Sequence, residues 1–338
     1  MNPHIHYEEE HALLRAEARR WLDERFPIAR VRSLADSALG EDPADWKELA
    51  SLGWLGLVIP EKHGGAGLGA THLAVLMEET GRRLLPSPLL PSTLAALALV
   101  LDGSEAQTAG FLPAIASGEA RAVYAKSASI WGAEQADAFV VSTRDGIEIV
   151  ERGAARLTVT PEIVLDRTRR SARVTRNGVA LASVEASPRL TAWACVALAA
   201  EMAGGADALL AMTAAYAATR EQFGKPIGSF QAVKHPLVNV LIGVESLRSL
   251  VYAAAGALDA HSPDAETLAR MAKAQASEVY VFAASRAVQL HGGFGFTLDC
   301  DAHLYLKRAQ TTRPAFGDAM LQRRWLAERL PGPTPTMR

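Results

Sequence analysis

Between residues 220 and 231 the chain reads Arg-Glu-Gln-Phe-Gly-Lys-Pro-Ile-Gly-Ser-Phe-Gln, and a long helical pattern lies on each side of this segment. It offers a guanidinium for phosphate, an aromatic ring for stacking and an amide for an adenine edge. A second segment, Gln289-Leu-His-Gly-Gly-Phe-Gly-Phe296, falls where another helical pattern ends. Its glycines would let the backbone approach a pyrophosphate or a flavin closely, although such a run is also an ordinary helix C-cap.

The residues around these two segments repeat with a helical period. Apolar, partly alanine-rich patterns run over 190–219, 229–258, 264–290 and 303–330. Four long helices with short connections predict an antiparallel bundle, which we assign to a domain of residues 188–332.

The rest of the chain divides into a helical part and a β part. Apolar residues recur at three- and four-residue steps through much of 1–117, which predicts an N-terminal helical domain. Within 118–187, short β-rich runs flank Asp145–Gly146 and Asn177–Gly178, dipeptides typical of hairpin turns. About five strands are expected there, the last over 179–184. The predicted fold is therefore mainly α, with a small middle β domain between two helical domains.

Composition excludes several classes of function. The 338 residues carry a formal net charge of -2, which provides no field for nucleic acid. Neither Cys195 nor Cys300 has metal-ligand spacing, and the nine histidines show none, so no metal site is expected. No uninterrupted apolar run reaches the roughly 20 residues of a membrane span. We therefore expect a soluble, cytoplasmic protein.

Two further stretches complete a family resemblance. Glu48-Leu-Ala-Ser-Leu-Gly-Trp-Leu-Gly-Leu-Val-Ile-Pro-Glu-Lys-His-Gly-Gly65 and Met77-Glu-Glu-Thr-Gly-Arg-Arg-Leu-Leu-Pro86 resemble motifs of the acyl-CoA dehydrogenase family, as do the two C-terminal segments. The resemblance covers nearly the whole chain. It implies FAD, an acyl-CoA substrate, a dimer or tetramer, and an acceptor of the electron-transfer flavoprotein type.

The resemblance also assigns roles to particular residues. It implies that the FAD diphosphate and adenine of a neighbouring subunit are contacted by Arg220, Phe223 and Gln231. The same dinucleotide groove would be lined by Gln289, Gly292 and Gly293.

The chain departs from the family at the catalytic base. The reaction needs a carboxylate that takes the α-proton of the thioester while hydride leaves Cβ for the flavin. Alignment with the family places Phe316 at the usual base position and Ala194–Cys195 at the alternative one. Asp318 is a candidate substitute, but a solvated or helix-capping role is the simpler interpretation. Glu201 and Glu245 are also carboxylates within bundle helices, and ordinary paired or surface roles are simpler for both.

The β domain departs as well. It is short and lacks the Thr-Glu-Pro-Gly-like and Trp-Ile-Thr stretches that contact the flavin ring and substrate in the family. Its nearest remnant is Val123-Tyr-Ala-Lys-Ser-Ala-Ser129.

One hypothesis explains both departures. The chain resembles the shorter, base-less subunit of a heteromeric acyl-CoA dehydrogenase, of the kind found in steroid side-chain or dicarboxylate β-oxidation. It would complete the FAD site of a longer homologous subunit. The alternatives are a self-sufficient dehydrogenase with a relocated base, a non-enzymatic scaffold or ligand-binding homologue, and a flavin oxidase or monooxygenase on the same fold.

Overall fold

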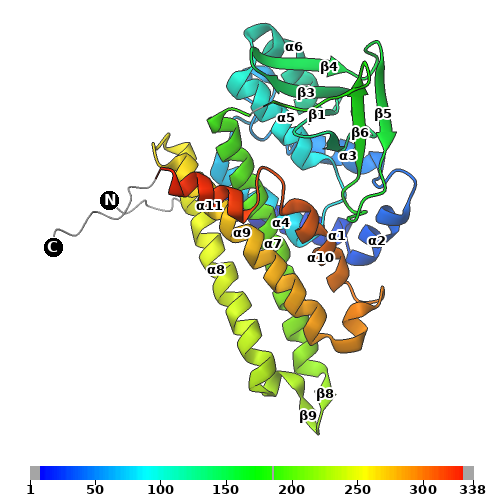
Figure 1. Cartoon of the computed structure of the whole chain (residues 1–338), viewed down its shortest axis with the longest axis vertical. Helices are drawn as coiled ribbons and strands as arrows, with labels where there is room; N and C mark the ends of the chain where they lie inside the picture. The colour runs from blue at the N-terminus through cyan, green and yellow to red at the C-terminus, as the bar shows by residue number, and fades with distance from the viewer. Residues whose placement is uncertain (1–7, 185, 330–338) are drawn as a thin grey trace, which may run out of the picture.

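A computed structural model describes residues 8–184 and 186–329, and within these residues six α-helices precede the first strand (Figure 1). They are α1 (Glu9–Arg25), α2 (Ile28–Asp36), α3 (Pro43–Ser51), α4 (Ala70–Arg82), α5 (Leu89–Asp102) and α6 (Glu105–Ala116). Two of these helices begin at a polar N-cap residue, α3 at Asp42 and α6 at Ser104. The Asp42 side chain accepts a hydrogen bond from the Ala44 amide, and Ser104 forms a capping box with Gln107.

Helix α4 joins this part of the chain to the C-terminal bundle. It is buried along most of its length and crosses α7 (Pro188–Thr219) at close range. A Cβ atom on Gly81 would lie 1.9 Å from the Glu201 carbonyl oxygen, and one on Gly204 would lie 1.8 Å from that of Glu78. The two glycines therefore permit the backbone-to-backbone crossing of these helices.

The middle of the chain forms two small sheets. One has the order β1 (Ala122–Tyr124), β3 (Ala138–Thr143), β4 (Gly146–Glu151), with β1 parallel to β3. The other has the order β2 (Ser129–Trp131), β6 (Ser171–Arg176), β5 (Leu157–Pro161), with β7 (Val179–Ala180) also paired to β6. Strands β1 and β2 were not expected from the sequence, and β7 is shorter than the predicted strand over 179–184.

The C-terminal part consists of α7, α8 (Gln231–Asp259), α9 (Ala265–Leu290), α10 (Ala302–Thr312) and α11 (Ala319–Ala327). A single helix over 303–330 was expected, and residue 330 lies outside the described residues. The chain instead breaks between α10 and α11, where Pro314 and Gly317 disfavour a continuous helix and the Asp318 side chain caps α11. The mainly helical fold with its small β part is confirmed, whereas the domain boundaries 1–117, 118–187 and 188–332 remain predictions.

Two bundle helices are long and apolar enough to cross a membrane by length and composition. In α7, 72% of the most apolar window is buried within the fold, and in α8 the share is 33%. The core helix of a soluble bundle satisfies the same criterion, and α7 packs between α4, α8 and α9. A helix can therefore have a high mean hydropathy even though its sequence contains no uninterrupted apolar run of about 20 residues.

Candidate functional site

The two C-terminal segments lie at the same end of the bundle, which we call the tip: residues 220–231 together with 289–296. The first segment contains the hairpin of β8 (Glu221–Gln222) and β9 (Lys225–Pro226), drawn at the end of the bundle in Figure 1. The second contains the 3-10 helix Gly292–Phe296. Tyr216, four residues before Arg220, stacks on His291 with ring centroids 4.3 Å apart and on Phe294 at 6.4 Å. This stacking holds the segments side by side.

The tip presents its predicted FAD residues to solvent. Arg220, Phe223, Gln231, Gln289, Gly292 and Gly293 are all exposed. The Phe223 side chain is 93% exposed, and its ring meets that of Phe230 edge-on at 6.1 Å. These residues therefore have little part in the core of their own chain.

Backbone conformation at the tip is unusual. Phe223 has φ +55° and the following Gly224 has φ +78°, so both central residues of the hairpin turn are left-handed. A turn with positive φ at both central residues favours Asn-Gly. An aromatic residue at the first of these positions is strained. Strain of this kind gathers at functional sites, where an observed outlier supports a hypothesis of function. Gly292 also has a positive φ, +62°, and a Cβ atom there would meet nothing within 4 Å.

The chemistry of the tip fits part of an FAD molecule. If FAD binds here, Arg220 would provide a cation for the diphosphate, and Phe223 would provide a ring on which a base could stack. Gln231 and Gln289 supply amides, and the Gly292–Gly293 backbone leaves open space for close approach. All of these groups face outward, so the nucleotide they suit is one that reaches the tip from outside this subunit's core.

A separate pocket of about 510 Å³ lies between the β part and the break between α10 and α11. Its walls include three aromatic residues, Tyr124, Trp131 and Phe316, and two cationic ones, Lys126 and Arg169. Tyr124, Lys126, Ser127 and Ser129 belong to the segment noted above as the remnant of the family's flavin-contacting stretch. The fold thus brings this remnant and Phe316 to one cavity from positions almost 200 residues apart.

Phe316 forms an aromatic wall of this pocket. Its ring stacks on that of Tyr124 with centroids 6.1 Å apart, and the Lys126 ammonium lies 5.4 Å from the Phe316 ring centroid. Burial raises the pKa of Tyr124, whose hydroxyl hydrogen-bonds Ser142 Oγ at 2.9 Å. Among the described residues that line the pocket, none is Asp or Glu. The lining therefore offers no carboxylate for proton abstraction.

The other candidate positions for a base lie elsewhere. Asp318 Oδ1 accepts a hydrogen bond from the Leu321 amide at 3.0 Å, as the N-cap of α11, and Asp318 is absent from the pocket lining. Ala194 and Cys195 are buried in the bundle core. Glu245 is exposed and pairs with Arg248 on the same helix.

Glu201 belongs to a buried ion cluster behind the pocket. Arg308 donates to Asp166 Oδ2 at 2.5 Å and to Glu201 Oε1 at 3.0 Å, and Arg169 also pairs with Glu201. The proximity of both carboxylates raises the pKa of Arg308 despite its burial. The Arg169 guanidinium lies 4.6 Å from the Trp131 ring centroid, so this cluster sets the position of the cationic pocket wall.

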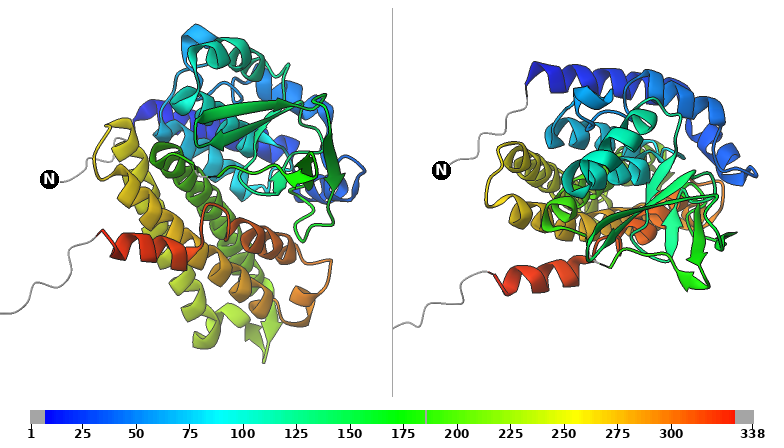
Figure 2. Two further views of the ribbon diagram at one scale, coloured as in Figure 1. Left: turned by 45° about the horizontal axis from the view of Figure 1, so that its top comes forward. Right: turned by 90° about the horizontal axis from the view of Figure 1, so that it is seen from above.

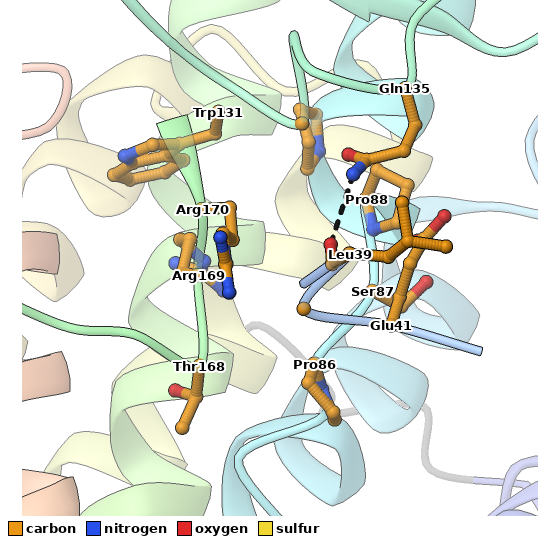
Figure 3. Close-up of a pocket in the computed structure, with 13 residues that line it drawn as sticks. Leu39, Glu41, Pro86, Ser87, Pro88, Trp131, Gln135, Thr168, Arg169 and Arg170 are labelled. Atoms are coloured by element: carbon orange, nitrogen blue, oxygen red, sulfur yellow. Dashed lines mark hydrogen bonds between the residues drawn. The ribbon is translucent and has the colours of Figure 1, made fainter. Parts of the chain in front are cut away.

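Trp131 and Arg169 were not predicted as site residues. They come from β2 and from the loop before β6, and no motif in the sequence joins them. Both residues also line a small crevice of about 20 Å³ together with Pro86, Ser87 and Pro88 (Figure 3). The contact between Trp131 and Arg169 depends on sheet pairing and on Glu201 of α7, which local sequence patterns do not reveal.

One group of possible metal ligands is also assembled by the fold. Glu10, His11 and His72 place one ligand atom each within 4.8 Å of the others, from the first turns of α1 and α4. His11 Nδ1 accepts a hydrogen bond from the Glu8 amide at 3.0 Å, as part of a capping box. In a neutral imidazole this leaves the proton on Nε2, so that nitrogen has no lone pair for a metal. Helix capping accounts for His11.

Comparisons with known proteins give the family. The acyl-CoA dehydrogenase N-terminal domain matches residues 8–119, and the acyl-CoA dehydrogenase C-terminal domain matches residues 189–330. The chain is 34% identical over 320 residues to acyl-CoA dehydrogenase IpdE2 of Mycolicibacterium smegmatis, covering 94% of this chain and 98% of that protein. This chain belongs to the acyl-CoA dehydrogenase family. The IpdE2 protein of Mycobacterium tuberculosis is 36% identical over 303 residues, covering 89% and 91%.

Solved structures agree with this assignment. The Tcur3481–Tcur3483 steroid acyl-CoA dehydrogenase superposes with a TM-score of 0.85 at 29% identity, covering 95% of this chain and 97% of that one. The ChsE4–ChsE5 complex from Mycobacterium tuberculosis gives 0.85 at 26% identity, covering 98% and 100%. As a family member, this acyl-CoA dehydrogenase homologue is a flavoprotein with FAD as cofactor and acyl-CoA dehydrogenation as its reaction class.

Proposed function

We propose that this chain is the base-lacking subunit of a heteromeric, FAD-dependent acyl-CoA dehydrogenase. A longer homologous subunit supplies the catalytic carboxylate, and the tip of this chain completes the FAD site of that partner. The observation that carries the proposal is the pocket wall at Phe316, with no acid among the described lining residues.

The chemistry of the reaction gives this observation its weight. Bound FAD accepts the hydride from Cβ, but the α-proton must be taken by a base within reach of the substrate. A phenyl ring cannot accept a proton, and none of the described residues that line the pocket is a carboxylate. The pocket can therefore hold and surround an acyl group without carrying out the proton abstraction.

The tip supports the second half of the proposal. Six residues that the family resemblance assigns to FAD are exposed at one end of the bundle, and Phe223 keeps a strained backbone there. A scaffold that had lost the nucleotide would have no use for that strain. The capping role of Asp318 and the ion pairs of Glu201 count against a self-sufficient enzyme with a relocated base.

The relatives suggest the setting. One structural neighbour is a complex of two differently named chains, and another is described as a steroid dehydrogenase. We accordingly propose a hetero-oligomer in the cytoplasm that acts on a steroid-derived or other bulky acyl-CoA. Its electrons would pass to an acceptor of the electron-transfer flavoprotein type.

The proposal is tested by co-expression of this chain with the longer homologue. The purified complex should contain FAD and oxidise acyl-CoA, whereas this chain alone should be nearly colourless and inactive. Arg220→Ala in this chain should lower the FAD content of the complex, because a charge-assisted contact to the diphosphate is lost. Arg20→Ala is the matched control. Arg20 is exposed on α1, and its Nη1 atom lies 4.0 Å from Glu24 Oε1, which is a long distance for an ion pair.

Two outcomes would contradict the proposal. Turnover by this chain alone, abolished by Asp318→Asn, would identify a self-sufficient enzyme. FAD content that Arg220→Ala leaves unchanged, in a complex that still assembles, would show that the tip does not bind the cofactor.

A further inference from the structure

The loop that carries Phe316 has a strained backbone. It connects α10 to α11 over residues 313–318, and within it Phe316 has φ +54° and Gly317 has φ +95°. Glycine adopts this region freely, but a left-handed phenylalanine persists only where the surrounding structure holds it. Something must therefore fix this loop.

A buried lysine meets both ends of the loop. Lys273 of α9 has 0% of its surface exposed. Its Nζ donates to the Arg313 carbonyl oxygen at 2.9 Å, to the Gly317 carbonyl oxygen at 3.1 Å and to Ser277 Oγ at 2.9 Å. An ammonium group has three N–H donors, so these three oxygens use all of them.

A buried amide reinforces the same loop from the other side. Gln322 of α11 is also 0% exposed, and its Nε2 donates to the carbonyl oxygens of Phe316 at 2.5 Å and of Gly317 at 3.4 Å. Arg270 holds the amide in place by donating to Gln322 Oε1 at 3.0 Å. The carbonyls at 313, 316 and 317 thus all receive hydrogen bonds from buried side chains.

We propose that Lys273 is a positioning residue for the acyl pocket. By joining the carbonyls at residues 313 and 317, it holds the loop in the conformation that places the Phe316 ring against Tyr124, and so sets one wall of the cavity. The inference rests on the proposed function only in taking this cavity as the counterpart of the family's acyl-CoA pocket. Lys273 lies outside the sequence motifs and the predicted site residues.

The charged and titratable groups that face Lys273 belong to two elements, the loop of residues 313–318 and α7. Burial is the main influence and lowers the pKa of Lys273 to about 8, with Arg313 lowering it further and Cys195 of α7 and Asp318 raising it. Burial in turn raises the pKa of the Cys195 thiol to about 11. A neutral amine has two N–H donors, and one of the three oxygens then loses its hydrogen bond from Lys273.

This behaviour gives a test that needs neither FAD nor a partner subunit. The full chain is labelled with 4-fluorophenylalanine, and the Phe316 signal in the fluorine NMR spectrum is assigned by its loss in Phe316→Leu. In the wild-type chain this signal should shift with pH, with a midpoint near the pKa of about 8 for Lys273. In Lys273→Met the shift with pH should disappear and the signal should broaden.

Two further variants separate positioning from general stability. Ser277→Ala removes one acceptor of the charged amine, so it should move the midpoint to lower pH while the fold is kept. Lys234→Met is the control, because Lys234 is exposed near the start of α8 and should leave the titration unchanged. A Phe316 signal that does not move with pH in the wild-type chain would overturn the proposal. So would a signal that titrates equally in Lys273→Met. Because the signal is read on the isolated chain, this result is independent of FAD content in the complex.

Discussion

Two phenylalanines in this protein share a backbone conformation and differ in almost everything else. Phe223 has φ +55° and Phe316 has φ +54°, and each is followed by a glycine with positive φ. Phe223 is 93% exposed on a hairpin at the tip. Phe316 lines a cavity, stacks on Tyr124 and belongs to a loop held by Lys273 and Gln322.

The difference distinguishes a site that suits a ligand from outside the chain from a site whose strained backbone is held by hydrogen bonds within the chain. At Phe316 the strain is offset by buried hydrogen bonds within the same chain. The Phe223 side chain makes few contacts within its own chain. A ligand or neighbouring subunit that covers it would explain why the strained conformation is kept. This comparison supports the proposal that the tip binds a ligand from outside its own chain and that the pocket keeps its shape without a base.

The largest expected effect comes from removing the buried support behind the pocket. Arg308→Met would leave Asp166 and Glu201 without their shared cation in a buried cluster, and breaking such a pair costs about 3–5 kcal/mol. Chemical denaturation of the isolated chain measures this loss.

The matched change at the tip is Arg220→Met, which should alter the free energy of unfolding by less than about 0.5 kcal/mol, as is usual for exposed positions. If both variants destabilised the chain equally, the contrast between an internally supported pocket and an outward-facing tip would be lost.

A smaller effect is expected from the pH dependence of stability at Lys273. Its pKa in the fold is about 8 against 10.5 for the ordinary value, so the unfolded chain binds more protons between these values. The free energy of unfolding of the wild-type chain, relative to Lys273→Met, should therefore rise with pH. Linkage gives about 2 kcal/mol between about pH 7 and pH 9.5.

Parallel unfolding curves at several pH values measure this difference. A difference between the two proteins that stays constant over this range would mean that the fold does not lower the pKa of Lys273.

The smallest expected effect on stability concerns Phe223. Asn tolerates a left-handed backbone better than Phe, so Phe223→Asn should leave the stability of the isolated chain unchanged or raise it by up to about 1 kcal/mol. The same variant should weaken FAD binding in the complex, because a stacking ring is removed.

Thermal unfolding of the isolated chain and FAD titration of the apo complex measure the two halves of this prediction. Loss of stability without loss of FAD affinity would show that Phe223 serves the fold of its own chain and no external ligand.

Much of the architecture and of the tip could be predicted from the sequence because the signals are local. Helical periodicity marks α1, α7, α8 and α9, and the hairpin dipeptides mark the β part. The segments at 220–231 and 289–296 carry recognisable residues in a short span. Strands β1 and β2 were missed because three-residue strands have too few residues to show a period.

The sequence by itself determined the order of helical and β elements, the family and the absence of a carboxylate at position 316, since each depends on nearby residues. Tertiary structure alone decided that Trp131 and Arg169 share a wall with Phe316, and that Lys273 supports the loop from a distant helix. These relations join groups 40 to almost 200 residues apart along the chain. Buried hydrogen bonds and ion pairs of this kind form only where packing brings such groups together and excludes water.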